Sequence, residues 1–335
     1  MGWYAIQRVD DAIDLTRDRL WPIERGTWLR FALIMFFVGG GGVGVPTFGQ
    51  SFSGGDPGSS DPSVGLGAIP EWVIVAVVAL VILGIALALA LGVIGALMEF
   101  VFVESLRSDR VEIRASGRQF GPKGLRLFGF RLAIGLIVVA VFVLPIVLLA
   151  AVFYGGGAVA FASLLVIFTL LSPFAFVFAF VVGVIDGFTT HFVVPIMILE
   201  DRGVLSAWKR FWGPLKREWK QLVVYLVVMF AISVAVGLLG GIAGFAVAIV
   251  LAVPLAVFVV PIGMMVIAVG SGPLQIAGLV AIVVLVALYV IALVVTGLLI
   301  NTPLETYRRY FALLVLGDID DEFDIIPDRR PAIEG

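Results

Sequence analysis

The sequence Arg-Phe-Trp-Gly-Pro at residues 210–214 decides how this chain is interpreted. Residues 118–122 are Arg-Gln-Phe-Gly-Pro, and residues 19–22 are Arg-Leu-Trp-Pro. The pattern Arg-x-aromatic-(Gly)-Pro therefore occurs three times, and another aromatic residue and a long apolar run follow each copy. Because internal repeats outrank local patterns in assigning a fold, we expect three copies of one unit, at approximately 5–104, 105–200 and 201–305.

The composition is that of an integral membrane protein. The chain has 335 residues, of which 61% are hydrophobic and 14% charged, and its mean hydropathy is +1.15. Soluble domains are nearer half apolar and one quarter charged. Cysteine is absent and His191 is the only histidine, which excludes disulfides, thiolate metal sites, cysteine nucleophiles and paired-histidine zinc motifs. The N-terminal residues carry acidic and basic side chains without a short apolar core, so we expect no cleaved signal peptide.

The charges predict the topology. All 22 Lys and Arg residues fall before Phe31, at 107–131, at 202–220 or from Arg308 onward. The positive-inside rule places these four segments in the cytoplasm, and an even number of spans must then separate neighbouring segments. We expect about six transmembrane helices in three hairpins, with both termini cytoplasmic. In this prediction 247–269 is bent, proline-broken or re-entrant; the alternative is seven spans with an external acidic tail.

Each repeat is expected to begin with a cytoplasmic amphipathic helix in the membrane interface. Residues 5–20 place Ile6, Val9, Ile13 and Leu20 near one face at helical spacing. A corner at the aromatic-Pro pair would then lead into the first span. The basic and aromatic side chains of these segments suit membrane lipids, including anionic head groups. The candidates for this role are Arg19, Trp21, Arg118, Phe120, Arg210 and Trp212.

One stretch resembles a known type of membrane domain. Residues 192–200 are Phe-Val-Val-Pro-Ile-Met-Ile-Leu-Glu, and residues 207–210 are Ala-Trp-Lys-Arg. This pattern is similar to the membrane domain fused to some glycerophosphodiester phosphodiesterases, and to related uncharacterised prokaryotic polytopic membrane proteins. The resemblance implies a six-span, all-α integral membrane fold. It implies no activity, because the catalytic domain is missing and one histidine cannot supply its site.

Asp186 is the sharpest candidate for a functional residue. If the helix runs unbroken to Glu200, Asp186 lies about 21 Å from that end, near the middle of a membrane, where a carboxylate is costly. Thr190 shares its face and His191 is close to it, so the three could relay a proton or hold a polar head group. The alternative is that Asp186 bonds a neighbouring helix within the close packing of Gly183-x-x-x-Gly187.

Other acidic residues are interpreted as structural. Glu99 is expected to reach the interface or to pair with an arginine of the segment that follows it. Glu104, Glu200 and Glu305 recur at the ends of the apolar helices, where pairing with arginine is expected. Residues 306–335 are expected to form a solvated, acidic cytoplasmic tail.

No motif for a cofactor, a metal ion or nucleic acid is present. We therefore expect one membrane domain, 1–335, in the cell membrane, acting as a non-enzymatic scaffold, assembly factor or regulator. A protein partner or a homo-oligomer would fit this role. The alternatives are a transporter or lipid- or solute-binding protein that uses Asp186, and an intramembrane enzyme acting on lipid.

Overall fold

The computed structural model describes residues 4–22, 24–38, 71–108, 110–143, 145, 147 and 157–330, and no strand occurs among them. Five helices within this part are long and apolar enough to cross a membrane, and Gly26–Val38 is a shorter apolar helix. The chain thus has the architecture of a multi-pass α-helical membrane protein. The first expected span, Trp28 to Val45, is described only as far as Val38, and the loop at 47–70 lies outside the described residues.

The chain separates into two compact units. The first comprises 1–39 and 214–335, so its sequence is interrupted by the second, 40–213. Each is described by itself. The helices of the first unit are α1 (Tyr4–Leu20), α2 (Arg25–Val38), α9 (Trp219–Val269), α10 (Pro273–Ile319), η4 (Asp321–Phe323) and η5 (Pro327–Arg329).

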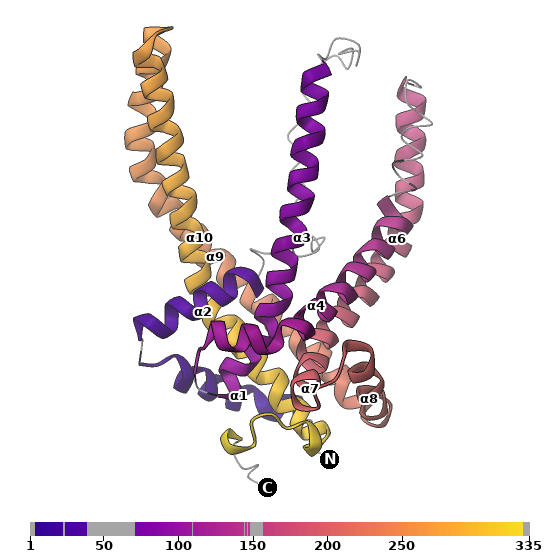
Figure 1. The fold of residues 1–335 in the computed structure, drawn as a ribbon. Helices are drawn as coiled ribbons and strands as arrows, with labels where there is room; N and C mark the ends of the chain where they lie inside the picture. Colours follow the sequence, from indigo (N-terminus) through magenta and orange to yellow (C-terminus); the bar gives the residue numbers. More distant parts are fainter. Residues whose placement is uncertain are drawn as a thin grey trace. The chain divides into compact units, whose positions relative to one another are not determined.

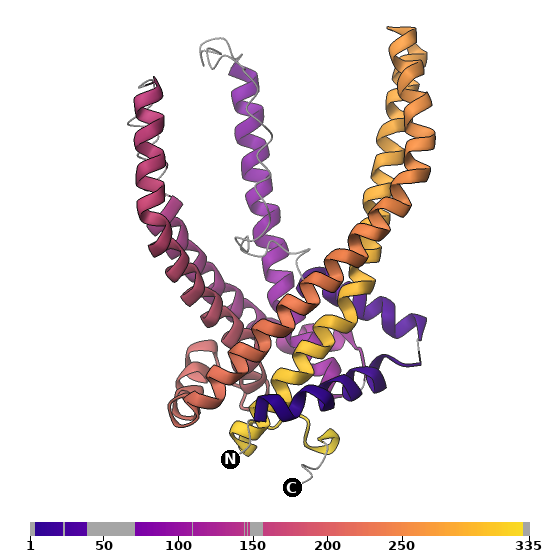
Figure 2. The ribbon, with the colours of Figure 1, turned by 180° about the vertical axis from the view of Figure 1, so that it is seen from behind.

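Helices α9 and α10 form a long antiparallel hairpin, and Figures 1 and 2 show the two running side by side to the turn. Near the open end of the hairpin Tyr225 stacks on Phe311, with ring centroids 5.6 Å apart. Near the turn, a Cβ atom on Gly278 would collide with the side chain of Val266. Gly278 therefore permits the close approach of the two helices at that point.

The turn that joins the two helices has the sequence Gly270-Ser271-Gly272-Pro273. Gly270 has φ 69° and Gly272 has φ 111°, a region that residues with a Cβ atom rarely adopt. Pro273 begins α10, where its fixed φ suits the first helical position and its missing N–H is not needed. The local chemistry of these four residues therefore accounts for the turn.

The prediction of a proline-broken or re-entrant segment at 247–269 is wrong, and a bend in this segment remains a prediction. These residues belong to α9, which continues through Pro254 and Pro261 to Val269. A helix keeps its backbone groups paired, which an apolar environment demands, and proline is tolerated within such helices. One hairpin therefore occupies 221–300, as the prediction of two spans in this region requires.

Helix α1 lies against α10 through mostly small and polar side chains. Its buried side chains are Ala5, Arg8, Ala12, Thr16 and Leu20, whereas Ile6 and Ile13 are exposed. Small and polar side chains at this spacing allow close packing, and Thr16 donates a hydrogen bond to the carbonyl of Ala12. Ile6 and Ile13 therefore lie outside the packed face of α1, and their place in the membrane interface remains a prediction.

The prediction of a solvated tail is also wrong for the residues described. Residues up to Ile319 belong to α10, and the following chain folds back on the unit. Phe323, Ile325 and Ile326 are buried. These three apolar side chains within an acidic sequence explain the docking, because their burial removes apolar surface from water.

The second unit is built around the crossing of two helices, α3 (Glu71–Arg107) and α4 (Ile113–Val138). A Cβ atom on Gly124 would lie 3.0 Å from the Cα atom of Leu97, so the helix backbones approach closely. Phe120 stacks on Phe100, with centroids 5.9 Å apart. The remaining elements are η2 (Val139–Val143), α6 (Gly157–Phe188), η3 (Thr189–Val193), α7 (Val194–Leu199) and α8 (Val204–Arg217), of which α8 extends past the boundary of the unit.

The expected corner occurs in only one of the three copies of the repeated motif. Helix α1 ends at Leu20, before Trp21 and Pro22, but Pro122 lies inside α4 and Pro214 lies inside α8. A proline inside a helix costs about 3 kcal/mol. Around Pro122 the buried Phe120 and the close contact at Gly124 hold the helix against α3, and this packing offsets the cost. The threefold repeat itself remains a prediction.

Candidate functional site: an arginine shared by three helices

Arg131 of α4 lies at the centre of the candidate site in the second unit. Its Nε donates to Oδ1 of Asp186 on α6 at 3.0 Å. Its Nη2 donates to the hydroxyl of Thr190 in η3 at 2.6 Å and to Oε1 of Glu99 on α3 at 3.3 Å. One guanidinium therefore links α3, α4 and the α6–η3 segment.

The two carboxylates differ in their surroundings. The side chain of Glu99 is 5% exposed, whereas that of Asp186 is 48% exposed. Arg131 balances one of the two negative charges, so the group of three carries a formal charge of about −1. Glu99 is thus a buried partner of the arginine, and Asp186 presents part of a carboxylate at the surface.

The site lies where exposed helices become buried. Residues 72–94 of α3 are exposed or partly exposed and almost wholly apolar, a length of about 34 Å that matches a hydrocarbon core of about 30 Å; burial begins at Gly95. On α6 burial begins at Phe188, two residues after Asp186, and on α4 the last buried residue is Leu127, one turn before Arg131. All three ionic side chains therefore lie near this boundary.

This placement changes the interpretation of Asp186. The estimate that put it near mid-membrane counted residues 187–199 as membrane-exposed, but Phe188, Thr189 and residues 192–198 are buried by protein. A Cβ atom on Gly183 or Gly187 would meet no atom within 4 Å, so these glycines mark no close helix contact in the part of the chain that the structure describes. It is the bond to Arg131 that joins Asp186 to another helix.

The sequence brought together part of this site. Asp186 and Thr190 were predicted to act together, and both contact Arg131. His191 is half-buried in η3, the π-helix that also contains Thr190. Glu99 was expected to pair with an arginine of the following segment, which it does. Arg131 itself was missed, although it is the last charge of the basic segment and begins a long apolar run.

A second contact connects η3 to α8. Nε1 of Trp208 donates to the hydroxyl of Thr189 at 3.0 Å, and that hydroxyl donates to the carbonyl of Ile185 at 2.6 Å. Phe211 of α8 stacks on Phe192, with centroids 5.3 Å apart. Short π-helices are frequent at functional sites, and this one has polar contacts at two successive threonines.

The six basic and aromatic candidates occupy different environments. Trp21 and Trp212 are exposed, whereas Phe120 is buried. Arg118 is exposed, Arg19 lies 5.3 Å from the ring of Phe31, and Arg210 pairs with Glu200 at 3.2 Å. Two of the three aromatic positions are therefore available to a membrane, and the third belongs to the packing of α4 against α3.

Glu104, Glu200 and Glu305 pair with arginine, as expected, but Glu305 lies inside α10 and not at a helix end as predicted. Arg107 lies 3.7 Å from Glu104, Arg308 lies 2.6 Å from Glu305, and Arg202 lies 2.8 Å from Glu200. Nearby, Lys123 bonds the carboxylate of Asp201 at 2.8 Å and the carbonyl of Met197 at 2.8 Å. The hydrogen bond from Lys123 lowers the pKa of Asp201 below its ordinary value.

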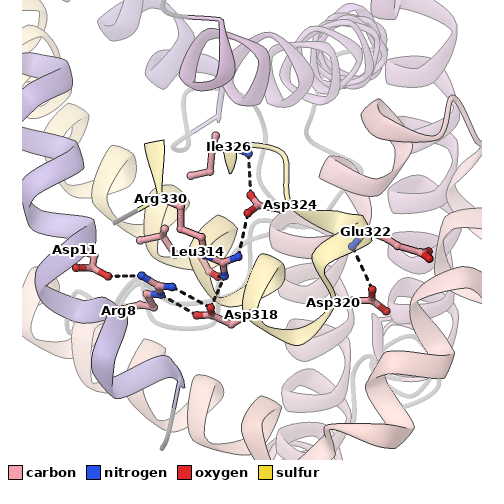
Figure 3. Close-up of polar contacts among 9 residues, drawn as sticks. All are labelled: Arg8, Asp11, Leu314, Asp318, Asp320, Glu322, Asp324, Ile326 and Arg330. Atoms are coloured by element: carbon pink, nitrogen blue, oxygen red, sulfur yellow. Dashed lines mark hydrogen bonds and ion pairs between the residues drawn. The ribbon is translucent and has the colours of Figure 1, made fainter. Parts of the chain in front are cut away.

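The first unit contains a separate ionic cluster, shown in Figure 3. Arg8 donates to both oxygens of Asp318, at 2.9 and 3.0 Å, and to Asp11 at 2.6 Å. Arg330 donates to Asp318, to Asp324 at 3.0 Å and to the carbonyl of Leu314 at 3.2 Å. The hydrogen bond with Asp318 raises the pKa of Arg8 above its ordinary value, so this guanidinium stays charged at physiological pH.

Within the described ranges, no group of three or more His, Asp or Glu residues could hold a metal ion. The model of one protein family, described as a family of unknown function, matches residues 3–326. Neither the comparison with curated proteins nor the comparison with solved structures finds a match.

Proposed function

Because the chain belongs to a family of unknown function, DUF7544, we propose its role from the geometry: a non-enzymatic scaffold or assembly component of the cell membrane. The observation that carries this proposal is the position of Arg131, which bonds side chains from α3, α6 and η3 where exposed apolar helix gives way to packed protein. In this role the exposed apolar helices anchor the chain in the membrane, and the packed residues beyond Arg131 in the second unit bind other proteins.

The ion pairs of Arg131 with Glu99 and Asp186 hold helices α3, α4 and α6 together. Removing one partner from a buried ion pair is costly because an uncompensated charge remains, so Arg131 and Glu99 favour a single arrangement of α3 and α4. A catalytic site would instead aim reactive side chains at a substrate. The chain has no cysteine and only one histidine, which leaves few side chains for acid–base or nucleophilic chemistry.

The proposed orientation follows the charges. The basic segments and both termini lie in the cytoplasm under the positive-inside rule, with α1 and α8 near the inner membrane surface. The three repeats within one membrane domain belong to the same proposal. A scaffold with this orientation presents the exposed charged side chains of its basic segments to cytoplasmic partners or to a second copy of the chain.

Native mass spectrometry of the full chain, extracted from its own membrane with surrounding lipid, tests the role. We expect a second polypeptide, or a second copy of this chain, at fixed stoichiometry. Recovery of a single copy with a bound solute or lipid that is lost in Asp186→Asn would overturn the scaffold and support the second candidate.

The second candidate is a transporter or a lipid- or solute-binding protein that uses Asp186. The specific observation in its favour is that nearly half of the Asp186 side chain is exposed beside Arg131. In proteoliposomes, Asp186→Asn should then abolish the flux or binding. Thr190→Val is the matched control, because it removes an Arg131 hydrogen bond but no charge; an equal loss in both variants would indicate a structural role.

A further inference from the structure

One face of α8 displays lysine and large apolar side chains in a single row. Leu205, Lys209, Trp212 and Lys216 are spaced by four, three and four residues, which places them along one side of a helix. All four residues are exposed. Helix α8 contains no Asp or Glu. We call this row the α8 stripe.

The opposite face of α8 fixes the direction in which the stripe points. Val204, Ala207 and Phe211 are buried, and the bond between Trp208 and Thr189 holds the same side of the helix. The helix therefore cannot rotate without losing packing and a hydrogen bond. Arg210 is bound to Glu200, so it does not belong to the stripe.

The chemistry of the stripe matches that of a phospholipid surface. Lysine ammonium groups attract phosphate, and tryptophan prefers the boundary between head groups and acyl chains. A leucine in the same row adds apolar area that such a surface would cover. A solvated face would carry charges of both signs and few large apolar side chains.

We propose that the α8 stripe binds the head groups of anionic phospholipids in the cytoplasmic leaflet, with Lys209 and Lys216 on the phosphates and Trp212 and Leu205 at the acyl boundary. This inference rests on the proposed cytoplasmic position of α8. Because each lysine near an anionic surface favours binding about fivefold, loss of both should reduce the preference for anionic lipid by at least about tenfold.

The test compares two variants of the full chain that each lose two exposed positive charges. Lys209→Gln/Lys216→Gln changes the stripe, and Arg110→Gln/Arg114→Gln changes exposed arginines before and at the start of α4. Each protein is placed in nanodiscs of phosphatidylcholine mixed with phosphatidylglycerol, and retained lipids are counted by native mass spectrometry. We expect the wild type and the arginine variant to retain phosphatidylglycerol preferentially, and the stripe variant to lose that preference.

Equal losses in the two variants would show a general effect of positive charge and would overturn the inference. Unchanged retention in the stripe variant would also overturn it. If the α8 stripe instead binds a partner protein, that protein would stay bound in nanodiscs of pure phosphatidylcholine, and its detection there would overturn the inference. A second readout uses brominated lipids. The chain has seven tryptophans, so a smaller quenched fraction in Trp212→Phe than in the wild type places this side chain at the bilayer, and an undiminished fraction places it away from the lipid.

A topology measurement separates failure of this inference from failure of the proposed function. The chain has no cysteine, so Ser206→Cys on the exposed side of α8 can be labelled with an impermeant maleimide. Labelling from the cytoplasmic side alone supports the orientation, and lipid results then decide the stripe. Labelling only from outside would refute the proposed topology, whatever the lipid measurements show.

Discussion

Arg8 donates two hydrogen bonds to the carboxylate of Asp318, although 310 positions separate the two residues in the chain. Both side chains are buried. Asp318 also accepts from Arg330, so a single carboxylate joins α1, the last turn of α10 and the C-terminal segment. The N- and C-terminal parts of the first unit therefore depend on the same side chain.

Asp318→Asn should destabilise the first unit strongly. The amide removes the negative charge between two arginines and leaves them partly buried, and breaking a buried ion pair in this way costs about 3–5 kcal/mol. Asp14→Asn is the control, because Asp14 is exposed on α1, the helix that carries Arg8. Unfolding of the purified protein in detergent measures both. A loss no greater than in the control would show that the cluster is dispensable.

Arg131→Met should destabilise the second unit, because it leaves the buried carboxylate of Glu99 without its arginine. The expected loss is again about 3–5 kcal/mol. The double variant Arg131→Met/Glu99→Gln removes both charges and should recover a large part of that loss. A double-mutant cycle from unfolding experiments gives the coupling free energy between Arg131 and Glu99. Strictly additive effects would contradict the proposal that this ion pair stabilises the second unit.

Gly317→Ala should release the C-terminal segment. A Cβ atom at this position would lie 3.0 Å from Cγ of Asp324 and 3.2 Å from Nη1 of Arg330. Overpacking costs about 1–3 kcal/mol, so trypsin should cleave the bond between Arg329 and Arg330 roughly tenfold faster. Gly297→Ala is the control in the same helix, because its Cβ atom would meet nothing within 4 Å. Equal cleavage in both variants would rule out close packing at Gly317.

Asp201 should contribute little to stability despite its close ion pair. Its side chain is 90% exposed, and exposed pairs are weakened by water and salt. Lys123 lowers the pKa of Asp201 below its ordinary value of 3.8. The ion pair therefore contributes its full stabilisation above pH 3.8, and this contribution is lost as the pH falls through the lower pKa of the folded protein. Asp201→Asn should therefore leave the melting temperature at neutral pH unchanged, while Lys123→Met lowers it by also removing the bond to Met197. A marked loss in Asp201→Asn would contradict this.

The sequence predicts the long apolar helices and their turn well, because apolar runs and Gly-Ser-Gly-Pro act through local chemistry. It predicts the continuation of helices through proline poorly. Pro122 continues α4 because Phe120 and Gly124 pack against α3, and such tertiary contacts are not visible in a local pattern. The buried face of α1 was missed for the same reason, since small and polar residues pack there.

The candidate site was predictable as residues but not as an assembly. Asp186, Thr190 and Glu99 are polar residues within apolar sequence, which marks them individually. Their common partner Arg131 belongs to a run of basic residues and carries no mark of its own. Only the crossing of α4 with α3 and α6 shows which arginine enters the protein.

The pairing of Arg8 with Asp318 also sets an order of events during synthesis. At about 5–20 residues per second, Arg8 leaves the ribosome roughly 15–60 s before its partner is made. The whole of 40–213 is translated in that interval, so α1 lacks its ionic partner on α10 while the second unit is made. The first unit therefore closes only after the second unit has been translated, because Asp318 is made after residue 213.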